Sequence, residues 1–557
     1  MTMQRGLFVT GALLLALAGC GETADTLEEA VDIAAEGGAK HLREPLRPAG
    51  DAPRVLVFAL DGVGHKALDG ALERGALPTL AALLGHRDDS TSFAHGVSVG
   101  PVLTVLPSIT LAAWTTLFTG APPGESGVPG NEWFDRENAR FYAPAPVSVS
   151  GRADALASLN GQLMDTLVAA PTLFERADVR SYVSLLTVHR GADILALQGV
   201  EELLDMVAAF PEGAVGDEPV DRELYAAVDR GSATGMADLV RDEGPPDLGV
   251  VYFPGIDLYT HAARSPLAEQ QRYLAEVTDA AMAEVLDAYR AAGALEGTYV
   301  IVTADHGHTP VLNDATHALG GDSAFAVEAA LEEAGFRVRP AELEPSSEDH
   351  QAVLAWQGAF AYLSLADRST CGAAGAICTW PAPPRWEEDV LPAARAVASA
   401  AESHPSSPLD LVILRRSTGP GESALFVLRD GEPVALDADL AASPRPELLA
   451  FAERLAWLTA GPHGDHAGDI LLMTRLGASM AEEERYYFSG PYHSWHASAE
   501  AQDSHAPLLV ARVDLPGTEI RSRMGAVAER PTQLDFVDLV LRLLERAAEG
   551  AAAVSPP

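Results

Sequence analysis

Short apolar runs, each bounded by turn residues, recur along the chain and predict buried strands. They lie at 54–60, 182–188, 248–254, 298–304 and 506–512. Helical patterns alternate with these runs, and the clearest, at 271–295, leads directly into the run at 298–304. Because strands that alternate with helices typically form a parallel sheet covered on both faces, we expect an α/β fold with a mostly parallel sheet sandwiched by helices.

The stretch from 310 to 467 has a different pattern, with several proline-rich joints and no recognisable catalytic motif. Strand-like runs at 359–365, 410–416 and 424–430 predict a smaller α+β cap, inserted in the catalytic body, that could overhang the site and influence the choice of substrate. The run at 468–475 predicts a return to the main sheet. We therefore expect one catalytic domain over 51–546 that includes this insert.

The first 20 residues predict an export signal. Arg5 precedes an apolar run from Leu7 to Ala18 that is too short to span a bilayer permanently. The segment that ends at Cys20 resembles a bacterial lipobox, so we expect cleavage before Cys20 and a lipid anchor on it; an ordinary signal peptide or short membrane anchor with an incidental cysteine is the alternative. Since Gly21 is not an aspartate, an outer-membrane anchor facing the periplasm or the exterior is favoured.

The segments next to the two ends are polar and rich in small residues. Residues 21–50 predict a tether that holds the domain away from the membrane, and residues 547–557 predict a disordered tail. The other two cysteines, Cys371 and Cys378, are close together in the sequence, so an exported protein is expected to join them in a local disulfide. A soft metal site there would lack companion ligands.

Charge limits the partners of the protein. The formal net charge is −41, and nearly all the basic residues are arginine. Because binding to a nucleic-acid polymer needs a basic surface, such a partner is excluded and a small substrate is expected. Bound divalent cations would make a pocket locally positive even on this acidic protein, and so allow it to hold a phosphoryl group.

Carboxylates, imidazoles and one hydroxyl recur in five short motifs. The candidates are Asp61, Thr110, Asp257, His261, Asp305, His306 and His496. Asp61, Asp257 and Asp305 follow predicted strands, and ligands of parallel sheets gather at these carboxyl ends. Carboxylate and imidazole ligands together suit zinc. Each motif alone is weak, but their joint order along the chain predicts a site for two divalent ions.

In order and wording these segments resemble the alkaline phosphatase superfamily, and most closely its type I phosphodiesterase and nucleotide pyrophosphatase branch. The resemblance implies an alkaline phosphatase-like core with two Zn²⁺ ions. The first ion would be held by Asp257, His261 and His496, and the second by Asp61, Asp305, His306 and the oxygen of Thr110. Paired ions stabilise both the attacking and the leaving oxygen of an in-line displacement, and coordination lowers the pKa of a hydroxyl nucleophile.

The resemblance makes Thr110 the nucleophile, at the start of a helix that ends in Thr119 and Gly120. Ser108 is the rival hydroxyl. A helix beginning at Thr110 would direct backbone N–H groups at the phosphoryl oxygens. Asn131 matches an asparagine that donates a hydrogen bond to phosphate in this branch, and a neutral donor fits a monoanionic diester. The alternative is that Asn131 only shapes a turn beside Gly130.

Two histidines compete in the last motif, and the resemblance selects His496 over His493. His496 is followed by a small residue and a serine, and then by Asp503, Ser504, His505 and Pro507 at the spacing of the family. Ala497 stands where the family has glycine. Of the remaining histidines, His308 is the one of interest, because it follows the predicted ligand pair at 305–306.

The expected activity is zinc-dependent hydrolysis of a phosphodiester or pyrophosphate through a covalent phosphothreonine intermediate. Hydrolysis of phosphonates or phosphomonoesters by the same superfamily is an alternative, as is an inactive surface-binding lipoprotein with the same fold. The pattern leaves the leaving group and the oligomeric state open.

Overall fold

A computed structural model of the chain describes residues 38–50, 53–89, 91–145, 152–159, 162–200, 203, 220–320, 323, 325–339, 350–371, 378–476, 485–529 and 531–545. The predicted signal peptide with Cys20, the first part of the predicted tether and the predicted tail lie outside these residues. No helix within the described residues is long and apolar enough to cross a membrane.

The body of the protein is built on a nine-stranded central sheet. Its order is β1 (Ala39–His41), β8 (Ile194–Ala196), β7 (Ser181–Ser184), β9 (Leu248–Phe253), β2 (Arg54–Leu60), β10 (Thr298–Ala304), β19 (His505–Ala511), β4 (Gly96–Leu103) and β3 (Ser92–Phe93). The run from β8 to β10 is parallel. The outer strands β1, β19, β4 and β3 pair antiparallel. The predicted α/β fold is confirmed, and the parallel part is its centre.

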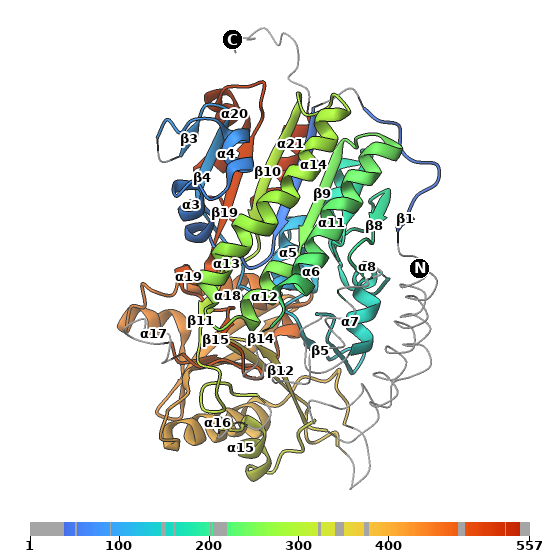
Figure 1. The fold of residues 1–557 in the computed structure, drawn as a ribbon. Coiled ribbons are helices and arrows are strands. Elements are labelled where there is room, and N and C mark those ends of the chain that lie inside the picture. Colours follow the sequence, from blue (N-terminus) through green and yellow to red (C-terminus); the bar gives the residue numbers. More distant parts are fainter. Residues whose placement is uncertain are drawn as a thin grey trace, which may run out of the picture.

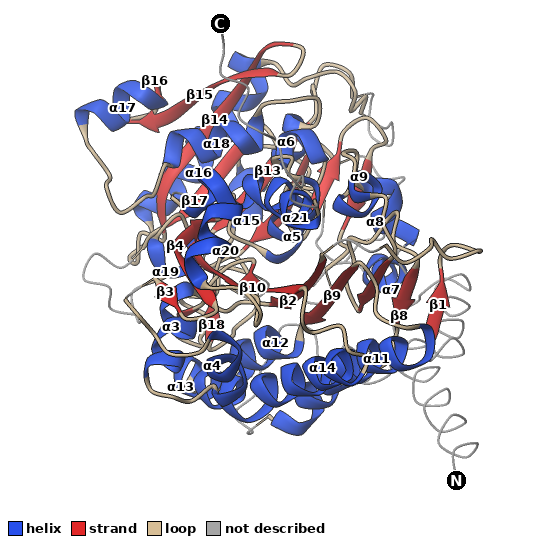
Figure 2. Cartoon of the chain, turned by 90° about the horizontal axis from the view of Figure 1, so that it is seen from above, coloured by secondary structure: helices blue, strands red, loops and turns tan. Residues whose placement is uncertain are grey.

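Helices cover both faces of this sheet, as Figure 2 shows. One face carries α3 (His65–Glu73), α4 (Pro78–Leu84), α11 (Arg222–Glu243), α12 (Gly255–Ala262), α13 (Pro266–Tyr273) and α14 (Asp279–Ala291). The other carries α5 (Thr110–Thr119), α9 (Leu173–Ala177), α20 (Gly517–Met524) and α21 (Phe536–Leu544). Apolar side chains hold the second layer together; Phe118 of α5 contacts Phe174 of α9 and Phe536 of α21.

The predicted elements agree closely with the observed ones, with two exceptions. The strand expected at 182–188 ends early at Ser184, because the chain turns at Leu185 with a positive φ of 55°. The helix expected at 271–295 is the C-terminal part of a longer run in which α13 and α14 are joined by a π-helical turn, η1 (Leu274–Thr278).

A second sheet gathers with its helices at one end of the body (Figure 1). Its order is β12 (Ala352–Gln357), β13 (Phe360–Leu365), β17 (Ile470–Thr474), β14 (Leu409–Gly419), β15 (Glu422–Arg429) and β16 (Glu432–Ala435). Every pair in it is antiparallel. Helices α15 (Val327–Glu333), η2 (Trp386–Val390), α16 (Leu391–Ser403), α17 (Leu436–Ala442) and α18 (Phe451–Thr459) accompany it.

Strand β17 corrects one prediction. The run at 468–475 does not return to the central sheet; it pairs with β13 and β14 of the second sheet. All five residues of β17 are buried. A strand covered on both faces has the same continuous apolar pattern in either sheet, so the pattern could not identify its partners.

The described end of the predicted tether also belongs to the folded body. Strand β1 pairs with β8 at the edge of the central sheet, and Arg47 forms an ion pair with Asp193 at 3.0 Å. Residues 38–50 therefore do not form a free tether, because main-chain pairing and this ion pair fix them to the sheet edge. Elsewhere, Cys371 and Cys378 are joined by the expected disulfide.

Short elements complete the described structure: α6 (Pro123–Ser126), β5 (Trp133–Asp135), β6 (Arg140–Tyr142), α7 (Arg152–Leu159), α8 (Gln162–Leu167), β11 (Thr309–Pro310), η3 (Gly464–Ala467), β18 (Ser494–Trp495), α19 (Ala501–Ser504), η5 (Gly525–Ala528) and η6 (Gln533–Asp535). Of these, β11 and β18 pair with each other beside the candidate site.

Candidate metal centre and active site

The polar motifs meet at the carboxyl ends of the three central strands. Asp61 directly follows β2, and Asp305 directly follows β10. Asp257 and His261 lie on α12, which follows β9; their spacing of four residues puts both on one face of the helix. Because β9, β2 and β10 are parallel neighbours, their carboxyl ends bring these side chains to one edge of the sheet.

The carboxylates and imidazoles form three overlapping groups within the described residues, each with ligand atoms within 4.8 Å of one another. The first group is Asp61, Asp305 and His306, and it matches the set expected for the second ion. The set expected for the first ion is divided between two groups that share Asp257. One of these groups also contains His261 and His308, and the other contains His306 and His496.

Three of the imidazoles are fixed by the same kind of contact. Nδ1 of His261 lies 2.8 Å from the Ser494 carbonyl oxygen, and Nδ1 of His496 lies 3.1 Å from the Ser108 carbonyl oxygen. Nδ1 of His306 makes the equivalent contact with a carbonyl in its own loop, at 3.1 Å. Since a carbonyl only accepts, each Nδ1 donates, and the lone pair of each neutral ring is on Nε2. This is the orientation in which histidine binds metals.

Several buried atoms at the centre have no hydrogen-bond partner. They are Oδ1 of Asp61, Oδ2 of Asp305 and Nε2 of His261. Nε2 of His306 is only 3.1 Å from Oδ2 of Asp305. An unsatisfied buried polar atom costs about 1–3 kcal/mol, and these atoms are electron-pair donors that face one another. A divalent cation would satisfy them together, so the donor set fits a metal centre.

Burial controls the electrostatics of the protein groups at this centre. Burial, followed by repulsion from Asp305 and Asp257, raises the pKa of Asp61 well above its ordinary value. Burial also raises the pKa of Asp305 to about 6. For Asp257, burial acts in the same direction, but His261 and His308 outweigh it and hold the pKa well below its ordinary value. A bound cation would favour the ionised form of all three carboxyl groups.

Thr110 is the first residue of α5, and its hydroxyl faces this cluster. Oγ1 of Thr110 lies 3.3 Å from Nε2 of His306. The helix ends at Gly120, whose left-handed backbone closes the last turn. The rival hydroxyl, Ser108, is fully buried and donates to the Ser498 carbonyl oxygen at 2.7 Å. Of the two hydroxyls, only that of Thr110 is placed at the cluster and at the N-terminal end of a helix.

Asn131 is buried beside Thr110 and not in an exposed turn. Its Oδ1 accepts the Leu111 N–H at 3.1 Å, which fixes the orientation of the amide. The backbone N–H of Asn131 donates to Oε1 of Gln357 in β12 at 2.9 Å. Thr110 and Asn131 both line a pocket whose other members are Asp61, Leu111, Ala145, Leu185, Thr187, Leu203, Tyr252, Pro254, Asp257 and Leu258.

Comparison with known families identifies the family of the chain. The model of the type I phosphodiesterase / nucleotide pyrophosphatase family matches residues 55–373, more than half of the chain. The chain belongs to this family. It is accordingly a phosphoester hydrolase of the alkaline phosphatase superfamily, and the family resemblance stated from the sequence is confirmed.

Comparison with solved structures finds several similar chains. A phosphonoacetate hydrolase from Sinorhizobium meliloti 1021, in complex with phosphonoformate, is 17% identical, with a TM-score of 0.45 over 90% of this chain and 100% of the other. Murine ectonucleotide pyrophosphatase/phosphodiesterase 5 is 16% identical, with a TM-score of 0.47 over 88% of this chain and 95% of the other. The human protein of that name is 13% identical, with a TM-score of 0.47 over 88% and 94%.

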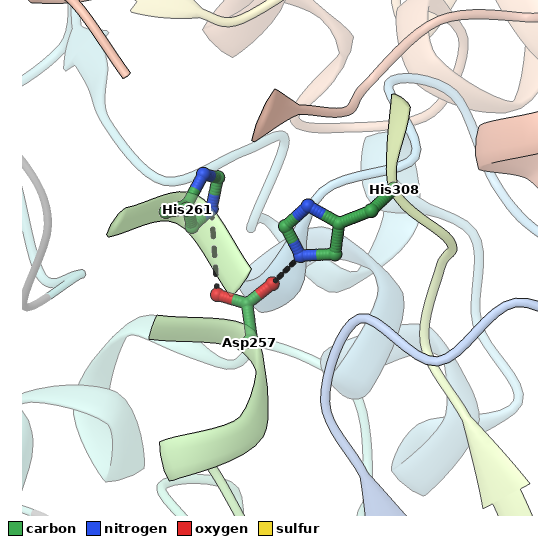
Figure 3. Close-up of side chains that lie close together, drawn as sticks. All are labelled: Asp257, His261 and His308. Carbon is green, nitrogen blue, oxygen red and sulfur yellow. Dashed lines mark hydrogen bonds and ion pairs between the residues drawn. The ribbon is translucent and has the colours of Figure 1, made fainter. Parts of the chain in front are cut away.

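The structure of this family member adds residues to which the sequence assigned no role. Tyr252, in β9, donates its hydroxyl to Oδ2 of Asp61. Gln357 comes from the second sheet and contacts the loop of Asn131. His308 lies against Asp257 and is drawn with His261 in Figure 3. Only His308 gave a signal in the sequence, through its position two residues after His306; the other two are recognisable only from their contacts.

His493, the histidine not selected, lies outside these metal groups. Its N–H donates to the His261 carbonyl oxygen at 3.0 Å, and its side chain lines a separate pocket that includes Arg264, Pro266 and Leu312.

Proposed function

We propose that the protein is a zinc-dependent phosphodiesterase or nucleotide pyrophosphatase that acts through a covalent phosphothreonine at Thr110. The observation that carries this proposal is the position of the Thr110 hydroxyl, 3.3 Å from Nε2 of His306 and at the N-terminal end of α5. A nucleophile in this place faces both the candidate metal ligands and the backbone N–H groups of a helix start.

The proposed ligands are those that the family resemblance implies. Asp61, Asp305 and His306, together with the Thr110 oxygen, would hold one ion. Asp257, His261 and His496 would hold the other. Bound zinc supplies Lewis acidity that lowers the pKa of the Thr110 hydroxyl and stabilises negative charge on the attacking and leaving oxygens.

The chain's own groups account for the rest of the reaction. Oγ1 of Thr110 releases its proton to solvent and forms a bond to phosphorus while the bond to the leaving alkoxide or phosphate breaks. The leaving oxygen takes up a proton from solvent. Water then breaks the bond between Thr110 and phosphorus, which releases the phosphorylated product and restores the hydroxyl. Asn131 and the Thr110 N–H, at the start of α5, donate to the phosphoryl oxygens in both steps.

The lining of the pocket favours a diester. Among the described residues that line it, none is Lys or Arg, and half are apolar. A monoanionic phosphodiester needs less compensation by protein cations than a dianionic monoester does, and an apolar wall suits an uncharged organic substituent. Phosphonates and monoesters would enter the same site, so a substrate panel separates these alternatives.

The decisive experiment measures turnover of a chromogenic phosphodiester by zinc-loaded protein. We expect Thr110→Ala to lower kcat by at least about 10³-fold, because the nucleophile is lost. Thr110→Ser is the matched control and should keep measurable turnover, since it keeps the hydroxyl. Wild-type turnover in Thr110→Ala would refute the nucleophile assignment. A wild-type protein that binds zinc but turns over no diester, phosphonate or monoester would indicate an inactive binding protein.

We also propose that the enzyme is an outer-membrane lipoprotein anchored through Cys20 and that its substrate is small. The apolar run before Cys20 and the net charge of −41 support this. Metabolic labelling with a radioactive fatty acid tests it: the wild type should incorporate label, and Cys20→Ser should not. Label in Cys20→Ser would refute the anchor.

A further inference from the structure

His308 is the buried imidazole at this centre to which the proposed function gives no role. It follows β10 and immediately precedes β11, whose pairing with β18 places Pro310 opposite Ser494. Nε2 of His308 lies 2.6 Å from Oδ1 of Asp257, and Nδ1 lies 3.1 Å from Oγ of Ser494 (Figure 3 shows the contact with Asp257). Both ring nitrogens are therefore engaged by side chains of the site.

Two distances around Asp257 separate the possible roles of its neighbours. Nε2 of His308 is 2.6 Å from Oδ1, which is the length of a charge-assisted hydrogen bond. Nε2 of His261 is 3.4 Å from Oδ2 and has no hydrogen-bond partner. Two donors on one tetrahedral zinc, with bonds of about 2.0–2.1 Å, are about 3.4 Å apart. Thus Oδ2 and His261 have the spacing of two ligands, whereas Oδ1 and His308 share a proton.

The orientation of the rings agrees with this division. His261, His306 and His496 each direct Nδ1 to a main-chain carbonyl, which leaves the Nε2 lone pair for a metal. His308 makes no such contact with a carbonyl: its Nδ1 meets the Ser494 hydroxyl, and its Nε2 meets a carboxylate. A carboxylate oxygen at 2.6 Å requires Nε2 of His308 to carry the hydrogen, and a protonated Nε2 cannot bind a metal.

The backbone next to Asp257 and His308 packs closely against their hydrogen bond. Gly62 has a φ of +67°. A Cβ at this position would lie 2.5 Å from Oδ1 of Asp257 and 2.6 Å from Nε2 of His308. The turn after β2 therefore closes over the hydrogen bond and limits the rotation of both side chains.

We infer that His308 is a positioning residue: it donates Nε2–H to Oδ1 of Asp257 and so presents Oδ2 to the ion that Asp257 shares with His261. This inference rests on the proposed function, because it assumes that an ion is bound there. A carboxylate without this contact could rotate or bind through either oxygen. Hydrogen-bonded partners of metal ligands typically contribute 10–100-fold to metal affinity.

The test measures zinc affinity directly, by competition with a chromophoric chelator, in the wild type and in two variants. His308→Met fills the space without a donor. In this variant the affinity for the more weakly bound zinc ion should be about 10–100-fold lower than in the wild type. His308→Gln keeps a donor near the position of Nε2 and should remain within about 3-fold of the wild type. Cobalt-substituted protein should have the same visible spectrum in all three, since no ligand is lost.

Each other outcome contradicts a stated part of the argument. Equal affinity in His308→Met and the wild type would overturn the inference and leave the proposed function intact. A loss in His308→Gln as large as that in His308→Met, with a changed cobalt spectrum, would show instead that His308 is a ligand. Failure of the wild type to bind zinc would overturn both this inference and the zinc-dependent function.

Discussion

Ala497 shows how one backbone conformation explains a departure from the family pattern. The family has glycine at this position, next to His496. Ala497 has a φ of +87° and is fully buried. A side chain at positive φ costs about 1–2 kcal/mol through contact of its Cβ with the backbone. A glycine here would adopt this conformation without strain, and this chain has alanine there at a cost in stability.

Ala497→Gly should therefore cost less stability than the same substitution at a position without this strain. Relief of about 1–2 kcal/mol offsets the loss of one buried methyl, about 0.8 kcal/mol, and the greater freedom of glycine in the unfolded chain, about 0.5–1 kcal/mol, so we expect a net change near zero. Chemical denaturation of the zinc-loaded protein measures it. Ala499→Gly is the control, because Ala499 is equally buried without a positive φ, and it should be destabilising. Equal losses in the two variants would contradict the strain argument.

At the scale of elements, helix α12 depends on a buried carboxyl group outside the metal centre. Oδ1 of Asp229 accepts the Gly255 N–H at 2.7 Å, and Oδ2 accepts the Tyr273 hydroxyl at 2.9 Å. Burial raises the pKa of Asp229 to about 7. Asp229 thus fixes the first turn of the helix that carries Asp257 and His261. Once its carboxyl group ionises, burial of the charge lowers the stability of the folded protein.

The raised pKa predicts a pH dependence with a definite sign. The unfolded chain releases the Asp229 proton near pH 4, whereas the folded protein keeps it to about pH 7. The folded state binds more protons in this window, so Asp229 makes the protein lose stability as pH rises from about 4 to about 7.

Asp229→Asn removes this term. As pH rises within the window, the free energy of unfolding of the variant should increase relative to that of the wild type by up to about 1.4 kcal/mol per pH unit. Above about pH 8 the difference between the two proteins should be constant. Denaturation of both proteins at pH 5, 6, 7 and 8 measures the difference. Parallel curves across this range would contradict the assigned shift.

The turn between β12 and β13 gives the second sheet a role at the site other than that of a cap. Gln357 accepts the Asn131 N–H at 2.9 Å, and the Ala359 N–H donates to the His496 carbonyl oxygen at 3.3 Å. Between them, a Cβ at Gly358 would lie 1.8 Å from Nε1 of Trp495. This turn therefore supports both Asn131, the proposed phosphate donor, and His496, a proposed metal ligand.

Gly358→Ala should disturb the site more than the strain of a positive φ explains. Gly358 has a φ of +65° and no space for a methyl group. Gly431, in the turn between β15 and β16, has a φ of +75°, with its nearest atom at 4.0 Å. Gly431→Ala should cost about 1 kcal/mol and leave kcat unchanged. Gly358→Ala should cost more and lower kcat/KM for a phosphodiester by at least about 10-fold, and equal effects would argue against this role of the turn.

At the scale of the whole molecule, the sequence predicted the central strands and the ligand cluster better than it predicted the second sheet. Runs such as 298–304 are continuous and bounded by turns, and parallel strands fix where Asp61 and Asp305 must meet. The partners of β17 were not predictable, because a run buried on both faces fits either sheet. The role of Gln357 was equally hidden, since it depends on a contact between residues 226 positions apart.

Metal removal should destabilise the whole protein, because the proposed ions join segments that the chain connects only over long distances. Asp61, Asp257 and Asp305 follow β2, β9 and β10, and His496 comes from near the C-terminus. Without cations, three carboxyl groups face one another at one sheet edge of a protein whose net charge is −41. Folding would then bury these three carboxyl groups against their mutual repulsion, and burial already raises the pKa of Asp61.

A ligand at about 1,000 times its Kd stabilises the folded state by about 4 kcal/mol, so chelation should lower Tm by several degrees and added zinc should restore it. Differential scanning calorimetry at constant ionic strength measures both steps. Asp61→Asn is the control: it weakens one proposed position, and its Tm should respond less to zinc than that of the wild type. A wild-type Tm that is unchanged by a chelator, in protein shown to have lost its metal, would mean that the ions do not hold these strand ends together.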